Sequence, residues 1–170
     1  ATRERTLLKR QPVLGDFDPA NSTEHREWAT ASDGTLVPVS VVDGVFNEQD
    51  GSNPGVVTAY GSYEISSDPY FSVARLSLLD RGVVYAVAHV RGGGEMGKRW
   101  HDAGRMMAKR NSFTDFVAAG DFLAKAGYTA ADRLAIEGGS AGGLLMGAVL
   151  NLRPDLCRIA LLRVPFLDVI

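Results

Sequence analysis

This sequence of 170 residues has a single cysteine, no long apolar run and no large excess of charge of one sign. Cys157 is the only cysteine, so an internal disulfide is impossible, which agrees with a reducing compartment such as the cytoplasm. The longest uncharged apolar run, residues 141–150, is far too short to cross a bilayer. The formal net charge is −2, and lysine and arginine are scattered along the chain. These absences argue against a membrane span, a membrane-surface helix and a nucleic-acid-binding surface.

The composition that remains is that of a globular protein. Hydrophobic residues make up 45% of the sequence and charged residues 22%, which is enough apolar material for a core. The length fits one domain. No group of histidine and cysteine residues suggests a metal site, and no Walker sequence is present. The sequence therefore predicts one globular domain with neither a metal nor a cofactor.

Apolar runs and turn residues alternate in a regular order. Residues 24–31 and 36–42 flank Asp33-Gly34, which predicts an antiparallel hairpin. From residue 55 onward the pattern predicts alternating strands and helices, with strands at residues 55–60, 83–89, 134–137 and 158–164 and helices at residues 72–81, 112–126 and 141–152. This alternation predicts an α/β fold with a mostly parallel sheet and helices on both faces.

Two local features of the middle of the chain are also expected. Ser112 is a plausible N-cap for the second helix, with Asp115 as the acidic partner of a capping box. Residues 91–111 are rich in glycine and then heavily charged, so we expect a long, partly ordered connection there.

Residues 138–142, Gly-Gly-Ser-Ala-Gly, match the pattern G-x-S-x-G. They lie between a predicted strand and a predicted helix, which is the context of a nucleophile elbow. Glycines beside the serine would relieve collisions in so sharp a turn. Ser140 is therefore the candidate catalytic nucleophile, and the Ala141 N–H, at the start of a helix, is the candidate oxyanion-hole donor. The alternatives are a plain tight turn or a phosphate-binding loop.

A base for this serine is missing from the sequence. A serine hydroxyl needs a histidine oriented by a carboxylate, and in α/β-hydrolases both follow the serine along the chain. His25, His89 and His101 all precede Ser140, and no histidine follows it. We interpret the three histidines as structural, and we expect the acid and the base to lie beyond residue 170.

Several motifs in a fixed order resemble one known family. They are Arg-Leu-Ser-Leu-Leu-Asp-Arg-Gly at residues 75–82, His-Val-Arg-Gly-Gly-Gly-Glu-Met-Gly at 89–97, Lys109-Arg-Asn with Phe113-Thr-Asp, Gly-Gly-Ser-Ala-Gly-Gly-Leu-Leu-Met-Gly at 138–147, and Arg-Pro-Asp at 153–155 with Val-Pro-Phe at 164–166. Together they closely resemble the prolyl oligopeptidase family of serine peptidases, and its oligopeptidase B branch in particular.

The resemblance implies an α/β-hydrolase catalytic domain, of which residues 1–170 would be a part that ends after the sixth strand. It implies a serine peptidase that hydrolyses short peptides, with a preference for cutting after Arg or Lys. It also implies a β-propeller domain outside this chain. The triad Asp and His, and the acidic residues that select a basic side chain, would likewise lie outside it. The isolated chain is then expected to be inactive.

The same resemblance assigns two tyrosines. The family motif after the third strand, Tyr-Gly-Tyr-Gly-Ser-Tyr, corresponds here to residues 58–63, Thr-Ala-Tyr-Gly-Ser-Tyr. It implies that the Tyr60 hydroxyl completes the oxyanion hole and that Tyr63 forms an aromatic wall of the substrate pocket. The sequence departs from the family pattern at Thr58, at Ala59 and at Glu64, where a glycine is usual.

Three other interpretations remain open. Residues 92–97 match G-x-G-x-x-G, but a dinucleotide site needs a helix directly after the glycines, so we expect this loop to shape the region near the active site instead. An esterase or lipase on the same fold is a second possibility, although such enzymes often carry an HGGG-type loop that is absent here. The third is a catalytically inactive fragment.

Overall fold

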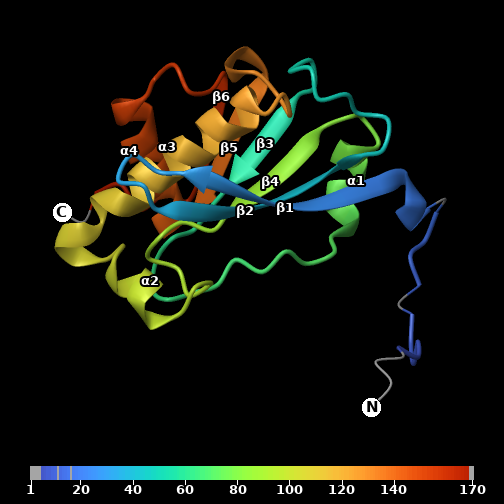
Figure 1. Cartoon of the computed structure of the whole chain (residues 1–170), viewed down its shortest axis with the longest axis horizontal. Coiled ribbons are helices and arrows are strands. Elements are labelled where there is room, and N and C mark those ends of the chain that lie inside the picture. The colour runs from blue at the N-terminus through green and yellow to red at the C-terminus, as the bar shows by residue number, and fades with distance from the viewer. Residues whose placement is uncertain (1–4, 11, 16, 169–170) are drawn as a thin grey trace.

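The computed structural model describes residues 5–10, 12–15 and 17–168 of the chain. Within them, six strands form one sheet in the order β1-β2-β4-β3-β5-β6 (Figure 1). Their bounds are Ser22–Thr30 for β1, Leu36–Gly44 for β2, Gly55–Thr58 for β3, Val84–Ala88 for β4, Leu134–Gly139 for β5 and Ile159–Arg163 for β6. The predicted strands are confirmed, with their ends shifted by a few residues.

The predicted hairpin joins β1 to β2, and its turn contains Gly34 at φ +82°. Glycine suits this turn because a side chain disfavours positive φ. β2 also runs antiparallel to β4, whereas the pairs β4–β3, β3–β5 and β5–β6 are parallel. The carboxyl ends of the parallel strands therefore meet at one edge of the sheet, which is where ligands bind in open α/β sheets.

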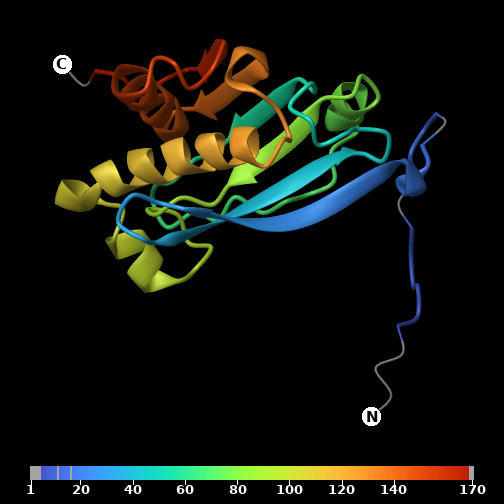
Figure 2. The same cartoon turned by 45° about the horizontal axis from the view of Figure 1, so that its top comes forward.

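Helices cover both faces of the sheet, as predicted. The helices are α1 (Val73–Leu79), α2 (Lys98–Asp102), α3 (Arg110–Lys125) and α4 (Ala141–Leu152). Figures 1 and 2 show α3 and α4 side by side on one face and α1 on the other. The side chains of α3, α4 and the sheet form the core, whose largest fully buried members include Phe116, Leu123, Ile136, Leu145 and Met146.

The connection after β4 is more ordered than expected. It contains α2, a 3-10 turn at Met106–Ala108 and the first residues of α3, which begins at Arg110. The predicted N-cap at Ser112 is therefore wrong: Lys109 is at the cap position, and Ser112 lies inside the first turn. The Ser112 hydroxyl and the Asp115 carboxylate bond instead to residues of the connection, so tertiary partners use the groups that were assigned to a capping box.

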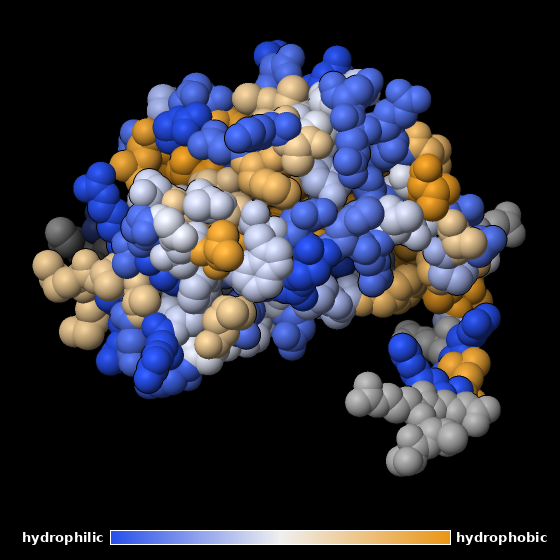
Figure 3. All heavy atoms as spheres, viewed as in Figure 1, coloured by the Kyte–Doolittle hydropathy of each residue, from blue (hydrophilic) through white to orange (hydrophobic). Residues whose placement is uncertain are grey.

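β6 forms one edge of the sheet and is only partly covered. Ala160 and Leu162 pack against the core, whereas Ile159 and Leu161, on the opposite face of the strand, are 54% and 48% exposed. In Figure 3 hydrophobic residues gather at the upper left, in the region of α4 and of the segment after β6. Among the described residues no helix has the length and apolar character that crossing a bilayer requires.

Candidate active site

Ser140 lies in a sharp turn between β5 and α4, as the G-x-S-x-G pattern predicts. Its backbone has φ +54° and ψ −117°, a conformation that costs a non-glycine residue free energy. Strain of this kind persists only where the surrounding structure imposes it, and it is characteristic of a nucleophile elbow.

Glycines on both sides of Ser140 leave room for close backbone approach. A Cβ atom on Gly138 would lie 2.3 Å from the Gly142 carbonyl oxygen, and one on Gly142 would lie 2.7 Å from the Ala59 carbonyl oxygen. A Cβ on Gly143 would collide with Pro165, in the segment after β6. The first turn of α4 can therefore pack directly against β5 and the end of β3 only without side chains at these positions.

Four backbone hydrogen bonds hold Ser140 in its strained conformation. Its N–H donates to the Arg163 carbonyl at 3.0 Å. Its own carbonyl accepts from the N–H groups of Gly143 at 3.0 Å, Leu144 at 3.2 Å and Phe166 at 3.0 Å. The side chain is exposed and makes no capping hydrogen bond, although serine at this position normally caps the helix. The hydroxyl thus takes no part in holding the turn.

Two residues that were expected in an oxyanion hole lie at or beside the first turn of α4. Ala141 is the first residue of α4, so its N–H has no acceptor within the helix and lies at the positive end of the helix dipole. Tyr60 follows β3, the strand next to β5, and its Cα would lie 3.6 Å from a Cβ atom on Gly142. The structure therefore brings the Tyr60 backbone against the first turn of α4.

Tyr63 lies beside Tyr60 at the surface. The two ring centroids are 6.4 Å apart with the rings tilted by 42°, and the Tyr63 side chain is 70% exposed. Tyr63 and Glu64 both have positive φ, at +58° and +59°. The backbone at residue 64 thus has a conformation suited to glycine, which explains in physical terms why a glycine is usual there.

The glycine loop of residues 92–94 supports the segment that follows Tyr60. A Cβ on Gly92 would lie 2.2 Å from the Gly61 carbonyl oxygen, and one on Gly94 would lie 2.3 Å from the Glu64 carbonyl oxygen. The Glu64 N–H donates to the Gly92 carbonyl at 3.2 Å, and the Ser67 N–H donates to the Glu95 carboxylate at 2.9 Å. These contacts hold the loop against the segment that follows Tyr60.

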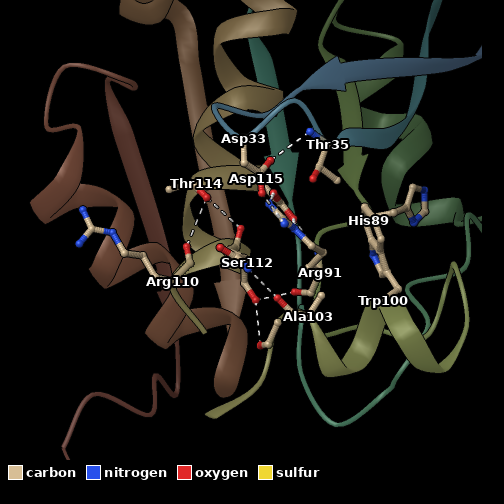
Figure 4. A network of polar contacts seen from close by, with 12 residues as sticks. Asp33, Thr35, His89, Arg91, Trp100, Ala103, Arg110, Ser112, Thr114 and Asp115 are labelled. Carbon is tan, nitrogen blue, oxygen red and sulfur yellow. Dashed lines mark hydrogen bonds and ion pairs between the residues drawn. The ribbon is translucent and has the colours of Figure 1, made fainter. Parts of the chain in front are cut away.

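An ion network, buried at Arg91 and Asp115 and exposed at Asp33, anchors the glycine loop (Figure 4). The Arg91 guanidinium binds both carboxylate oxygens of Asp115, at 2.8 and 2.6 Å, and also binds Asp33 in the hairpin turn at 2.6 Å. Asp115 is fully buried and also accepts the Arg91 N–H at 2.9 Å. The network joins the start of the loop to α3 and to the β1–β2 turn. The hydrogen bonds that Arg91 donates to Asp115 and Asp33 raise the pKa of its guanidinium above the usual value.

The histidines contact other groups than Ser140. The His25 ring approaches Thr23 and Asp43, the His89 ring bonds to the Ser40 hydroxyl at 2.8 Å, and the His101 ring bonds to the Gly92 carbonyl at 2.9 Å. The described part of the chain holds no group of three or more His, Cys, Asp or Glu side chains that could bind a metal ion. In residues 17–168, therefore, no histidine forms a Ser-His-acid triad with Ser140.

Sequence reasoning missed one residue near the site. The Lys109 ammonium donates to the Gly61 carbonyl and lies 2.8 Å from the Ser62 hydroxyl. Gly61 and Ser62 are the two residues that follow Tyr60. A lysine at the N-terminus of a helix, where acidic residues are favoured, is the sequence signal that could have drawn attention to it.

Known proteins resemble this chain in sequence and in fold. The dipeptidyl aminopeptidase BI of Pseudoxanthomonas mexicana is 52% identical over 170 residues, which is 99% of this chain and 23% of that protein. The prolyl endopeptidase of Elizabethkingia meningoseptica is 44% identical over 154 residues, 91% of this chain and 22% of that protein. The structure of oligopeptidase B from Leishmania major superimposes with a TM-score of 0.91 at 48% identity, over 98% of this chain and 23% of that one.

The family model described as the prolyl oligopeptidase family matches residues 69–170, which include Ser140 and the glycine loop. The fold agrees as well, because the mostly parallel sheet and its helices correspond to the α/β-hydrolase catalytic domain of the solved relatives. The chain spans less than a quarter of the length of the relatives named above. On this sequence and structural agreement, the chain belongs to the prolyl oligopeptidase family of serine peptidases.

Proposed function

We propose that Ser140 is the nucleophile of a serine peptidase that hydrolyses short peptides. The observation that supports this most directly is the strained turn at Ser140, whose main chain is fixed by four hydrogen bonds while its hydroxyl stays exposed and uncapped. We propose further that residues 1–170 form part of a catalytic domain, and that the triad Asp and His and a β-propeller domain lie outside these residues.

In the proposed reaction the Ser140 hydroxyl attacks the peptide carbonyl and forms an acyl-enzyme. The triad histidine takes the serine proton and gives it to the leaving amine. Water then attacks the acyl-enzyme, and the histidine takes the proton of the water and returns it to the Ser140 oxygen as the acyl group leaves. The Ala141 N–H and the Tyr60 hydroxyl stabilise the oxyanion of each tetrahedral intermediate. Donors held in place before the reaction need no reorganisation when negative charge develops, which is why they accelerate it.

We propose cleavage after Arg or Lys, with Tyr63 as part of the pocket wall. The high similarity to oligopeptidase B supports this preference. Two other specificities need a direct test, because two further relatives have other names. One is a dipeptidyl aminopeptidase, 52% identical to this chain, and the other is a prolyl endopeptidase, 44% identical. We also propose a cytoplasmic location, which the single cysteine supports.

The test uses the full-length protein that contains this segment. A fluorophosphonate probe should label one serine, and peptide mapping should place the label on Ser140. Ser140→Ala should lose both labelling and turnover, whereas Ser32→Ala, a change at an exposed serine in the hairpin turn, should keep both. Labelling of another serine, or full turnover in Ser140→Ala, would contradict the assignment.

Specificity is measured with amide substrates that differ in one feature. The panel contains a blocked peptide ending in Arg, one ending in Lys, one ending in Pro, and a free dipeptide amide. We expect the highest kcat/KM for the two basic substrates. A higher value for the proline substrate would favour prolyl endopeptidase activity, and a requirement for a free amino terminus would favour dipeptidyl cleavage.

A further inference from the structure

Lys109 makes contacts that helix stability does not explain. It occupies the cap position of α3, and Arg110 follows it. Cations at a helix N-terminus oppose the helix dipole, and the Lys109 side chain makes no capping hydrogen bond. The side chain is also half-buried, and burial lowers the pKa of its ammonium to about 8. Both the position and the burial thus cost free energy, so another interaction must favour a lysine here.

That interaction is with the segment that follows Tyr60. The Lys109 ammonium donates to the Gly61 carbonyl and lies 2.8 Å from the Ser62 hydroxyl. These are the two residues directly after Tyr60. Gly61 has φ +66°, and a Cβ there would lie 2.5 Å from the Val90 side chain, so the backbone at this point lies close to the end of β4. Lys109 therefore holds the chain at the bend through which Tyr60 leaves the sheet.

Lys109 is itself bonded to the start of α3, which contacts the rest of the domain. Lys109 also lies 3.3 Å from the Ser112 hydroxyl, which donates to the Arg91 carbonyl and contacts the Gly104 carbonyl at 3.2 Å. One helical turn further on, Asp115 binds Arg91 in the ion network (Figure 4). The ammonium is consequently carried by a helix start that is hydrogen-bonded to Arg91 and to Gly104, which suits it to setting the position of a neighbouring segment.

We infer that Lys109 is a positioning residue that fixes the Gly61–Ser62 bend and so directs the Tyr60 hydroxyl toward the oxyanion formed at Ser140. This inference depends on the proposed function, because the Tyr60 hydroxyl has a task only if Ser140 carries out acyl transfer. Lys109 does not touch the substrate in this scheme and acts through Tyr60 alone.

The experiment compares Lys109→Met, Lys109→Arg and Lys125→Met in the full-length protein. Methionine keeps the apolar stem and removes the charge and its donors, arginine keeps both, and Lys125 is an exposed lysine in the last turn of α3 that serves as the control. We expect Lys109→Met to lower kcat by about 10- to 100-fold with little change in KM, as a displaced catalytic group does. Lys109→Arg should recover part of this loss, and Lys125→Met should behave as wild type.

A double-mutant cycle with Tyr60→Phe tests the route of the effect. If Lys109 acts through the tyrosine hydroxyl, Lys109→Met should cost almost nothing further in kcat once that hydroxyl is removed. Equal losses of kcat with and without the hydroxyl would overturn the inference, and so would an unchanged kcat in Lys109→Met.

Amide hydrogen exchange of residues 61–67 separates this inference from the proposed function. Faster exchange in Lys109→Met supports the anchoring contact, and unchanged exchange overturns it, whatever the enzyme's activity. Ser140→Ala with full turnover would refute the proposed nucleophile, and the positioning of Tyr60 for catalysis would fall with it, even if exchange showed that Lys109 anchors the bend.

Discussion

Among single residues, Ser140 combines a strained backbone with a hydroxyl that makes no capping hydrogen bond. The main-chain groups of Ser140 are used by Arg163, Gly143, Leu144 and Phe166, which keeps the residue at positive φ. Its side chain takes no part in holding the turn. A change of side chain should therefore alter chemistry far more than folding.

Tyr60→Phe removes one oxyanion donor and leaves the ring. We expect kcat of the full-length protein to fall by about 100- to 1000-fold, the usual effect of losing one such donor. The thermal midpoint should stay close to that of wild type, because the ring contact with Tyr63 is kept. Steady-state kinetics and a melting curve measure the two effects. Unchanged turnover would remove Tyr60 from the mechanism.

Asp33 makes stability sensitive to acid. Its hydrogen bonds from Arg91 and from the Thr35 N–H lower its pKa from 3.8 to about 2. A carboxylate with a lowered folded-state pKa stabilises the protein above its unfolded-state value and loses that contribution as pH falls. The contribution of Asp33 should thus be complete above about pH 4 and should disappear between about pH 4 and pH 2.

Asp33→Asn tests this directly. The difference in thermal midpoint between wild type and the variant should shrink over that acid range, since both then carry a neutral group at residue 33. Asp132→Asn, a change at an exposed aspartate in another loop, serves as the control. A difference that does not change with pH would show that the Asp33 charge contributes nothing.

At the scale of elements, the glycine loop and the segment after Tyr60 fit together only through bare backbone. Gly92 and Gly97 both have positive φ, at +100° and +84°. A Cβ on Gly92 would collide with Gly61 and Gly104, whereas a Cβ on Gly97 would meet nothing within 4 Å. An alanine at either position would therefore have an unfavourable backbone conformation, but only the alanine at residue 92 would also collide with its neighbours.

Gly92→Ala should be much more damaging than Gly97→Ala. Both variants incur the cost of a backbone conformation that favours glycine, about 1–3 kcal/mol, but only Gly92→Ala also displaces the bend next to Tyr60. We expect a loss of kcat in Gly92→Ala of at least about 10-fold, because a displaced donor loses much of its effect. Urea unfolding and steady-state kinetics on both variants measure this. Equal behaviour of the two alanines would show that the contact with Gly61 is unimportant.

Signals local to one stretch of sequence predicted these elements well. The alternation of apolar runs gave the sheet and its helices, Asp33-Gly34 marked the hairpin, and α4 has the bounds that were expected. The start of α3 was predicted incorrectly because Ser112 and Asp115 have partners about twenty residues earlier in the chain, around Arg91. Lys109 was missed for the same reason, since its partners Gly61 and Ser62 belong to another segment.

The candidate site also contains residues that a local pattern predicted and residues that it did not. Ser140 and Ala141 were identified from contiguous residues, and the structure has them at the turn that the pattern predicts. The roles of Tyr60 and Tyr63 came from family resemblance and stay predictions, because a single sequence contains no local sign of an oxyanion donor on a distant strand.

At the scale of the whole molecule, β6 is a parallel edge strand with an apolar uncovered face. Exposed strand edges pair readily with other chains. We predict that residues 1–170, produced alone, self-associate and show no peptidase activity. Leu161→Lys should reduce association in light scattering, whereas Leu36→Lys, a change at a similarly exposed leucine in the hairpin, should not. A stable monomer with full turnover would contradict both statements.

The strand order also has a consequence for how the chain acquires its structure during synthesis. β3 lies at the centre of the sheet, between β4 and β5, yet both neighbours follow it in the chain. The ribosome therefore releases β3 before either of its hydrogen-bonding partners, and the second partner, β5, is complete only at residue 139. Pairings between distant segments form slowly. The parallel part of the sheet should accordingly be completed only once β5 has emerged, well after the β1–β2 hairpin.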